Sequence, residues 1–445
     1  MSTTLSEREP LDPSVSQRRI VEYRGRAGLR ELEADWRRLS SELPQRTRCH
    51  AYEAQAAYLD HLCVHPDKVR YLAFTDGDRV RAICPLEART ETSLKLPIPA
   101  WGLPFHPHWG VSDVLCPDDD IRRILVAAIT AHLRRRPEGR PLLVLGPMPE
   151  GSSLWEGLLS FGERLWASCE SDPSSHFDCE KTHDELLSRL SKHFRRNVRS
   201  HCNKVLKLGD ARFVTASEPE KLAAELESFL TVEASGWKGA AGAASAIRLD
   251  PELTAFYRDL VRNLRGDDDH CEINSLYVGD ACIASQFCVR TGGDYAILKI
   301  GYDEAYAKLG PGQVLMDATL RRCCEHPGIR RLDLGSWGPW QQDWHTEVQC
   351  MRQAHVAIRP VLGPPLVALV RFRFGRGREL FRWSRDRAGR AREAVTGACA
   401  AAVAGARRAG QAPSAESDGH ESAASAAPER PADAAERPAD GRPAC

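Results

Sequence analysis

Apolar and polar residues follow one another along the chain in two successive series of expected helices and strands. Apolar positions three and four residues apart indicate amphipathic helices, whereas short runs of β-branched and aromatic residues indicate strands. The first series occupies residues 19–172. Within it the pattern predicts helices over 29–39, 53–62 and 121–133 and strands over 20–23, 69–73, 80–86 and 141–145.

The second series occupies residues 173–360 and repeats the same order of elements. Its pattern predicts helices over 184–208, 218–235, 252–264 and 313–324 and strands over 271–278, 281–289, 295–302 and 329–334. The letters of the two series do not align well, so the similarity is one of element order. We therefore predict an α/β protein with two related modules in tandem, each with a mixed central sheet flanked by helices.

Both ends of the chain have a composition that cannot bury enough apolar surface to fold. Residues 1–18 and 408–445 are rich in Pro, Ser, Ala and charge, and we predict that they are disordered. Residues 361–407 mix basic and apolar side chains and predict a basic amphipathic helical extension. Its 366–392 part suits either contact with an anionic membrane surface or docking on the second module.

Charge and cysteine content narrow the class of protein. The 445 residues carry 61 Lys and Arg against 61 Asp and Glu, so net charge gives no reason to expect a nucleic-acid partner. The sequence has no apolar signal-like start and no apolar run of spanning length, so we expect a cytoplasmic protein, peripheral at most at the inner membrane face. Its 15 cysteines include no C-x-x-C pair, and acidic runs at 118–120 and 267–269 suit helix capping. We expect neither a disulfide scaffold nor a metal site.

The most informative segment is the strand 295–302 followed by Gly310-Pro-Gly312 and an amphipathic helix. The first-turn N–H groups of a helix are unpaired and its dipole is positive there, so this start could cradle an anionic cofactor. The simpler alternative is an ordinary strand-to-helix turn.

Four segments of the second module stand out in sequence, namely 190–199 (LSKHFRRNVR), 233–239 (EASGWKG), 298–312 (LKIGYDEAYAKLGPG) and 333–344, which contains Asp-Leu-Gly and ends in Trp-Gln-Gln-Asp-Trp. Together they resemble the BioF-like, CelD-type acetyltransferase family, a branch of the general-control-related N-acetyltransferase (GNAT) superfamily. The resemblance covers about 175–350, and the first module resembles the degenerate GNAT-like half of such proteins. It implies tandem GNAT-like (acyl-CoA N-acyltransferase) domains, acyl-coenzyme A such as acetyl-CoA as donor, and an amine as acceptor.

Two positions depart from the pattern of these relatives. Ala307 stands where the superfamily has Arg or Gln, three residues before the first glycine, with Lys308 beside it. Gln341 stands where the family has a lysine before the last tryptophan. For the diphosphate of the donor we expect binding by Lys308, Gly310, Gly312 and Gln313.

Acyl transfer to an amine needs a base for the amine, N–H donors for the thioester oxygen and an acid for the leaving thiolate. The candidate bases are Glu233 and Asp303, the latter followed by Glu304, and the candidate acids are Tyr302 and Tyr306. Lys299 lies between apolar neighbours on a strand, where a charge needs a partner or a ligand. We expect Lys299 and Asp303 to form the central pair, although Asp303 could equally cap a turn.

The expected substrate-binding residues are Trp237, Lys238, Arg195 and Trp344. Glycines flank Trp237 and Lys238, which indicates a loop over the site, but a tryptophan packed into the core is an equal alternative. Arg195 belongs to a basic helix face opposite an apolar stripe of Phe194, Val198, Cys202, Val205 and Leu208. That face could be simply solvated, could bind an anionic acceptor or the adenosine 3′-phosphate, or, least favoured, could bind nucleic acid.

The sequence contains no G-x-x-x-x-G-K-[S/T] loop, G-x-S-x-G elbow or H-E-x-x-H motif. The resemblance therefore leads us to expect an enzyme that transfers an acyl group from acyl-CoA to a small-molecule amine. The acceptor suggested by the family context is an amino sugar or lipid-linked precursor in envelope or exopolysaccharide biosynthesis. Two alternatives stay open, a Fem-type aminoacyl-tRNA-dependent peptidoglycan aminoacyltransferase and a non-catalytic scaffold of a polysaccharide assembly complex.

Overall fold

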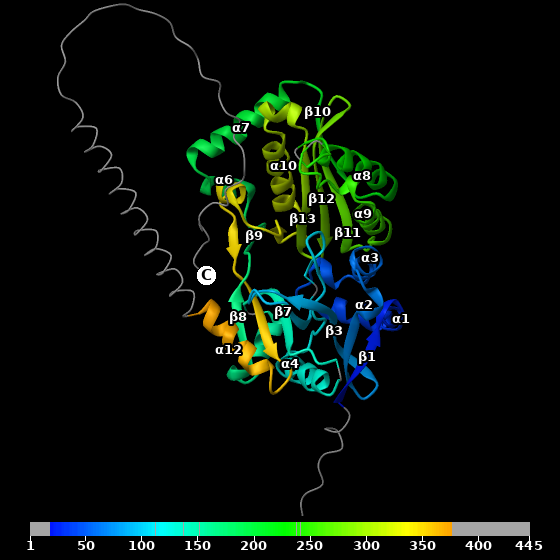
Figure 1. Cartoon of the computed structure of the whole chain (residues 1–445). Coiled ribbons are helices and arrows are strands. Elements are labelled where there is room, and N and C mark those ends of the chain that lie inside the picture. Colours follow the sequence, from blue (N-terminus) through cyan, green and yellow to red (C-terminus); the bar gives the residue numbers. More distant parts are fainter. Residues whose placement is uncertain are drawn as a thin grey trace, which may run out of the picture. The chain divides into compact units, whose positions relative to one another are not determined.

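A computed structural model describes residues 18–375, apart from 112, 137, 151, 237 and 241. The predictions for residues 1–17 and for the chain beyond 375 therefore lie outside the described residues. Two large sheets of seven strands each organise the described part, and helices flank both (Figure 1).

The first sheet has the strand order β1-β2-β3-β4-β7-β16-β8. All neighbours are antiparallel except β4 and β7, which are parallel. The bounds are β1 (Arg18–Arg24), β2 (Arg70–Asp76), β3 (Arg79–Glu91), β4 (Ile98–Gly102), β7 (Leu142–Pro149), β8 (Trp166–Glu170) and β16 (Met351–Ala357). A two-stranded hairpin, β5 (Phe105–His106) and β6 (Gly110–Val111), follows β4.

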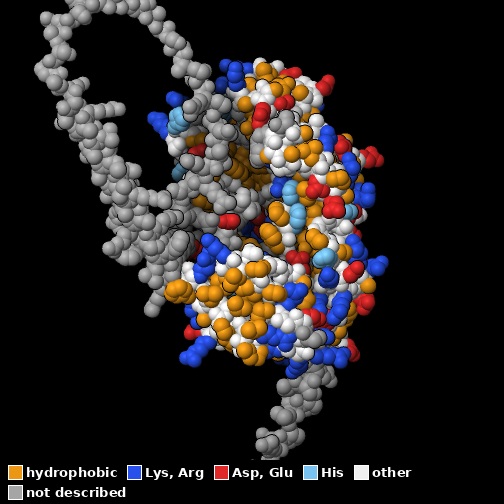
Figure 2. Space-filling model, in the orientation of Figure 1, with side chains coloured by type: hydrophobic (Ala, Val, Ile, Leu, Met, Phe, Trp, Pro, Cys, Tyr) orange, Lys and Arg blue, Asp and Glu red, His pale blue; other side chains and the backbone are white. Residues whose placement is uncertain are grey.

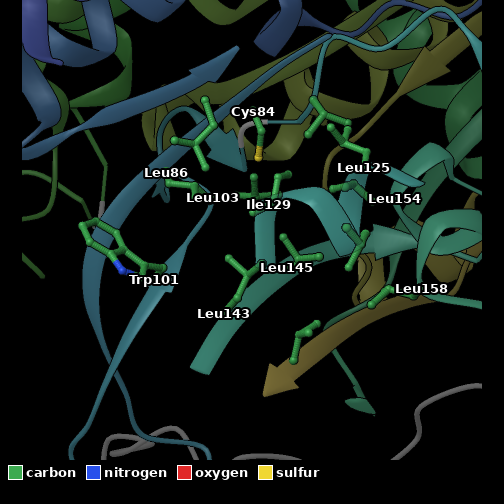
Figure 3. Close-up of a cluster of buried hydrophobic side chains, with 14 of the residues drawn as sticks. Cys84, Leu86, Trp101, Leu103, Leu125, Ile129, Leu143, Leu145, Leu154 and Leu158 are labelled. Carbon is green, nitrogen blue, oxygen red and sulfur yellow. The ribbon is translucent and has the colours of Figure 1, made fainter. Parts of the chain in front are cut away.

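The helices of the first lobe cover this sheet and bury its apolar side chains. They are α1 (Gly25–Glu31), α2 (Glu33–Glu42), α3 (Tyr52–Ala57), α4 (Asp119–Arg134) and α5 (Ser153–Leu159), with short 3-10 or π turns at Arg48–His50, Tyr58–Leu62, Pro66–Lys68 and Glu163–Leu165. Figure 3 shows one core, in which Trp101 and Leu103 from the end of β4 lie with Leu125 and Ile129 of α4 and with Leu143 of β7. This apolar core fills the region where β4 and β7 part.

The second sheet has the order β10-β11-β12-β13-β14-β9-β15, and again only its fourth and fifth strands, β13 and β14, are parallel. The bounds are β9 (Ser174–Asp178), β10 (Ala211–Ala216), β11 (Asp269–Val278), β12 (Ala281–Thr291), β13 (Asp294–Tyr302), β14 (Arg331–Asp333) and β15 (Glu347–Gln349). The two sheets thus share one strand arrangement. The predicted fold class, two related mixed-sheet modules in tandem, is confirmed.

Helices pack on both faces of the second sheet. They are α6 (His183–Arg189), α7 (Lys192–Leu206), α8 (Pro219–Glu233), α9 (Pro251–Asn263), α10 (Pro311–Glu325) and α11 (Pro339–Asp343), with 3-10 turns η6 (Ile247–Leu249) and η7 (Glu304–Leu309). One core joins α8 and α9 to the sheet through Phe229, Tyr257 and Phe287. A second core joins α7 and α10 to the sheet through Val198, Tyr295 and Leu320.

The chain crosses between the two sheets twice, and this differs from the expected boundary at 360. β8 lies in the first sheet and β9 in the second, whereas β15 lies in the second and β16 returns to the first, between β7 and β8. Residues 351–371 therefore complete the first lobe.

α12 (Gly363–Phe374), the last helix of the described residues, also contacts the first lobe. Its Val367 and Val370 are buried, and Arg371 donates to the carbonyl oxygen of Trp166 at 2.7 Å. The described part of the segment predicted to dock on the second module therefore packs on the first lobe instead, because β16 carries the chain back to the first sheet immediately before α12 begins. The rest of that segment lies outside the described residues.

Some predicted helices are divided in the structure. The expected helix over 184–208 breaks into α6 and α7 because Ser191 starts a new helix, its hydroxyl accepting the Phe194 N–H at 3.1 Å. The expected helix over 29–39 divides at Leu32. Within the described part of the chain, none of the helices has the length and apolarity that a membrane crossing requires.

Candidate active site

The parallel strands β13 and β14 separate after a short paired segment. They pair only from Asp294 to Ala296 on β13 and from Arg331 to Asp333 on β14. β13 then continues to Tyr302 without a strand partner on that side. The Ile300 carbonyl accepts a hydrogen bond from Lys238, and no neighbouring strand of the described residues covers the edge beyond Ala296, so that edge could bind an extended ligand.

A β-bulge lies in the same unpaired stretch of β13. On β12, Phe287 faces Lys299 and Cys288 faces Ile297, so Leu298 is an extra residue. The bulge turns both Leu298 and Lys299 toward the face covered by α8 and α9, where Leu298 packs beside Phe287. Bulges of this kind re-aim side chains and are frequent beside active sites.

Lys299 is a half-buried cation without an acidic partner. Within the described residues its ammonium group makes neither an ion pair nor a hydrogen bond. Burial lowers the pKa of Lys299, the charge of nearby Lys238 lowers it further, and Glu233 partly opposes the shift. The site therefore holds a lysine whose neutral form is easier to reach than that of a lysine in water.

Glu233 at the end of α8 fixes the loop that follows it. Lys238 Nζ lies 3.2 Å from Glu233 Oε1, and the Ile247 amide donates to Oε2 at 2.9 Å. Lys238 Nζ also donates to the carbonyl of Ile300 on β13, at 3.1 Å. Since Glu233 is only 3% exposed and both its oxygens are bonded, it holds Lys238 in place and is not open to a substrate.

The first lobe contributes two histidines that the sequence analysis did not identify. His106 and His108 lie on the β5–β6 hairpin, and His108 Nδ1 is 3.0 Å from the hydroxyl oxygen of Tyr257 on α9. Burial and the nearby charge of Lys299 lower the pKa of His108 to about 3 and also lower that of His106. Both imidazoles are therefore neutral at pH 7. The closely spaced histidines of Phe105-His-Pro-His-Trp109 were the available signal.

Trp109 anchors this hairpin in the second lobe. It is buried in the same core as Phe229 and Tyr257, and its ring centroid lies 5.5 Å from that of Tyr58. Arg48 donates to the Trp109 carbonyl at 3.0 Å and lies 3.6 Å from Asp333 at the end of β14. The histidines are thus held rigidly on the α8–α9 face.

The start of α10 has a left-handed glycine, which is compatible with both the anion-cradle hypothesis and an ordinary strand-to-helix turn. Gly310 has φ 60° and ψ 46° and offers no side-chain cap. The amides of Gln313 and Val314 bond to the Gly310 carbonyl, whereas the Gly312 amide makes no backbone hydrogen bond among the described residues. The free donor set is therefore smaller than the sequence suggested.

His201 of α7 lies over this helix start and was also missed by the sequence analysis. Its Nδ1 is 2.7 Å from Gln313 Oε1, and a Cβ on Gly310 would clash with the imidazole ring. Tyr302 is 41% exposed, and its ring carbon Cδ1 lies 3.8 Å from where a Cβ of Gly312 would be. The structure thus brings Tyr302, Gly312, Gln313 and His201 together, with Lys308 exposed nearby on η7.

The expected Lys299–Asp303 pair does not form. The Asp303 carboxylate accepts the Ala305 amide at 2.9 Å and so caps η7, while the Asp303 amide bonds to the Ile283 carbonyl. The bulge directs Lys299 toward Glu233 and Lys238 instead. Asp303 therefore has the capping role that was the alternative interpretation.

The expected substrate-binding residues have different positions. Trp344 is 3% exposed and packs edge-on against Phe177 and Phe194, with ring centroids at 6.3 and 5.3 Å, so it belongs to the core. Trp237 lies outside the described residues. Arg195 lines a cavity of about 540 Å³ on the outer side of α7 with Lys192, His193, Arg196 and Arg199. Of the expected α7 stripe, Val198 and Val205 are buried, but Leu208 is exposed because α7 ends before it.

The first lobe lacks a comparable helix start. Its equivalent helix, α4, is capped by Asp118, whose carboxylate accepts the amides of Asp120 and Ile121. Asp119 and Asp120 add negative charge to the first turn. A bound anion would be repelled there, so the uncapped, glycine-flanked helix start is a feature of the second lobe. Among the described residues, no group of three or more His, Cys, Asp or Glu side chains could hold a metal ion.

Several solved structures are similar to this chain at low sequence identity. A conserved protein of unknown function from Bacteroides thetaiotaomicron VPI-5482 is 10% identical, with a TM-score of 0.48, over 73% of this chain and 97% of that chain. L-PGS from Bacillus licheniformis is 12% identical, with a TM-score of 0.46, over 77% and 96%. A tandem GNAT protein from the clavulanic acid biosynthesis pathway is 15% identical, with a TM-score of 0.42, over 77% and 99%. These distant likenesses do not define an activity.

No curated protein matches the sequence. The model of the acetyltransferase (GNAT) domain family, however, matches residues 192–341. That range contains α7, the bulged strand β13, the start of α10 and β14, and the match confirms the resemblance to BioF-like, CelD-type proteins. Residues 192–341, which lie in the second of the two mixed-sheet lobes, are therefore similar to the acetyltransferase (GNAT) domain family.

Proposed function

We propose that the second lobe transfers an acyl group from acyl-CoA to an amine. The observation that carries this proposal is the separation of β13 from β14 beside an uncapped helix start, within the GNAT domain. A long thioester donor needs such an unpaired strand edge for its arm and a helix start for its phosphates.

The donor's diphosphate would bind at the start of α10. Gly312 offers a free amide there, Gln313 and His201 offer polar side chains, and Lys308 supplies a positive charge. Gly310 and Gly312 leave the backbone accessible to a phosphate. Ala307 contributes no side-chain donor, so His201 takes on added importance in this chain.

Proton transfer would depend on Lys299. Its neutral amine would take the proton from the acceptor, whose nitrogen then attacks the thioester carbonyl as the carbon–sulfur bond breaks. Tyr302 would return a proton to the departing thiolate. The lowered pKa of Lys299 supports this assignment, because a base must be partly unprotonated at the working pH.

Glu233 and Asp303 have positioning roles in this proposal. Glu233 keeps Lys238 close to Lys299, and Lys238 helps to depress the pKa of Lys299. Asp303 fixes η7, which leads into the α10 start. Lys238 would border the acceptor.

For the acceptor we propose a small amine such as an amino sugar or a lipid-linked precursor of envelope polysaccharide. Contact with the inner membrane face would suit such a precursor. Leu362, Leu369 and Phe372, at and beside α12, are exposed, and Figure 2 shows hydrophobic side chains gathered on the lower part of the visible face. This apolar surface supports the peripheral role.

The direct test is to incubate the full chain with acetyl-CoA and a panel of amines, including glucosamine, and to detect acetylated product by mass spectrometry. We expect acetylated product and coenzyme A in equal amounts, both dependent on Lys299. Absence of transfer to every amine, together with no binding of acetyl-CoA, would instead support the scaffold role.

A second candidate donor is aminoacyl-tRNA. The observation that favours it is α7, which carries Lys192, Arg195, Arg196, Arg199 and Lys204 and no acidic residue. Figure 2 shows Lys and Arg side chains at the upper left edge, where Figure 1 places α7. Protection of the chain from proteolysis by charged tRNA but not by acetyl-CoA would favour this donor.

A further inference from the structure

A second cavity, of about 310 Å³, lies away from the donor site. It is bordered by residues 43–46 of the first lobe and by the turn between β12 and β13. It therefore lies at the beginning of β13, whereas the α10 start follows the end of that strand. Its volume is at the lower end of the range for small-molecule sites.

Three arginines line this cavity, and each guanidinium group lies against a glycine. A Cβ on Gly293 would lie 2.6 Å from Arg330 Cζ, and a Cβ on Gly328 would lie 2.6 Å from Arg290 Nη2. A Cβ on Gly292 would lie 3.5 Å from Arg46 Nη2. Larger residues at the first two positions would push the guanidinium groups aside, so the glycines make room for them.

Two of these arginines lack an acidic partner. Arg46 pairs with Asp269 at 2.9 Å and with Asp268 at 3.7 Å. Arg290 only approaches the Gly292 carbonyl and His326 Nε2, both at 3.4 Å, and neither it nor Arg330 has a carboxylate within ion-pair distance among the described residues. The carboxylates on the cavity wall are Asp268 and Asp294. Together with Asp269, which neutralises Arg46, they match the three guanidinium groups in number. Anion binding here would therefore depend on Arg290 and Arg330, which have no carboxylate of their own within ion-pair distance among the described residues.

Thr291 adds an unused hydrogen-bonding group to the wall. Its side chain is 3% exposed, and its hydroxyl has no partner among the described residues. Buried polar atoms are normally bonded, so a free hydroxyl beside a cavity indicates a missing ligand or water. A hydroxyl and two guanidinium groups are the donors that a tetrahedral oxyanion prefers.

We propose that this cavity binds a phosphate group, held by Arg290 and Arg330 of the second lobe with Arg46 of the first. The site is separate from the proposed acyl-transfer site. Because its arginines come from both lobes, a bound phosphate would link the 43–46 segment to the β12–β13 turn. The phosphate could be the free ion or the group of a small phosphomonoester.

The test is calorimetric titration of the full chain with inorganic phosphate and, separately, with glycerol 3-phosphate at pH 7.0. We expect saturable binding that Arg290→Gln and Arg330→Gln each weaken by about tenfold or more. Arg262→Gln is the matched control, because Arg262 is an exposed arginine of α9 that does not line the cavity, and it should leave the affinity unchanged. Tighter binding of inorganic phosphate would identify the ligand as the free ion, and tighter binding of glycerol 3-phosphate would identify it as a phosphomonoester.

Gly293→Ala is a second variant that keeps every charge. It should displace the Arg330 guanidinium and weaken phosphate binding while the chain stays folded, because the side chain that must move is flexible. No saturable binding of either probe, or weakening no greater than in Arg262→Gln, would overturn the proposal. So would binding that Gln313→Ala abolishes and Arg330→Gln spares, since the phosphate would then lie at the α10 start.

Discussion

His108 of the first lobe and Tyr257 of the second lie side by side, with 3.0 Å between the imidazole Nδ1 and the phenol oxygen. Their rings meet edge-on, with centroids 5.9 Å apart. Through this contact the β5–β6 hairpin reaches the face on which the bulge presents Lys299. The first lobe, although its own helix start is occupied by Asp118, therefore forms part of the surroundings of the proposed base.

The β5–β6 hairpin should influence the pKa of Lys299. A carboxylate in place of His108 would stabilise the Lys299 ammonium and raise its pKa. If the neutral amine is the active form, the rising limb of the pH dependence of kcat/KM should move to higher pH by about one unit in His108→Asp. His65→Asp, at an exposed histidine, and the neutral His108→Asn should not move it. If the rising limb stays at the same pH in His108→Asp, the hairpin does not influence the catalytic base.

Substitutions of Lys299 can distinguish a role as general base from a role as a permanent positive charge. Lys299→Met should lower kcat by roughly 10²- to 10⁴-fold, the usual contribution of a general base. Lys299→Arg should not restore activity, because a guanidinium group keeps its proton. Steady-state kinetics with acetyl-CoA provide the measurement. Substantial recovery in the arginine variant would show that only positive charge is needed.

Glu233 should matter for stability because Lys238 depends on it. Glu233→Gln leaves the Lys238 ammonium without its anionic partner, and breaking a largely buried pair costs about 3 kcal/mol of unfolding free energy. Glu220→Gln, on the exposed surface of the same helix, should change stability by less than about 0.5 kcal/mol. Urea unfolding followed by circular dichroism measures both. Equal losses of unfolding free energy in the two variants would mean that the Glu233–Lys238 pair does not stabilise the protein.

Asp294 lines the cavity with Arg46, Arg290 and Arg330, and it should make anion binding in that cavity depend on pH. Burial raises the pKa of Asp294 to about 6; the charge of Arg331 opposes this rise, Asp333 adds to it, and Arg330 and Arg48 oppose it less strongly. The carboxyl group therefore loses its negative charge as pH falls through 6, which removes repulsion of a bound anion. Sulfate, whose own charge is constant in this range, should bind more tightly at pH 5.5 than at pH 7.5. The Asp294→Asn variant should bind sulfate tightly at both pH values. A sulfate affinity of the wild-type chain that does not change with pH would contradict the account.

Much of the fold could be predicted from the sequence because its long elements have clear periodicity. The strands β11 to β13 and the helices α8 to α10 were predicted within a few residues, since each combines regular apolar spacing with a recognisable boundary. The remaining, mostly short strands were missed, namely β4, β5, β6, β8, β9, β10, β15 and β16. Two of these, β9 and β16, take places in a sheet that sequence order alone does not reveal.

The site was predicted only where a residue conflicted with its local surroundings. Lys299 stood out as a charge among apolar neighbours, and Gly310 as a glycine before a helix. His108 and His201 reach the site from distant segments, so only the tertiary structure brings them there. Trp344 was misplaced because an aromatic side chain suits a core as well as a binding surface, and here the core prevails.

Binding of acetyl-CoA at the start of α10 is the central claim, and calorimetry on two glycine variants tests it most directly. Gly310→Ala adds a methyl group that strains a left-handed residue and clashes with His201, whereas Gly209→Ala adds the same kind of strain with nothing within 4 Å. We predict one acetyl-CoA bound per chain, with affinity reduced at least about tenfold, or about 1.4 kcal/mol, in Gly310→Ala and unchanged in Gly209→Ala. Absence of binding to the wild-type chain, or equal affinity in the two variants, would contradict the account.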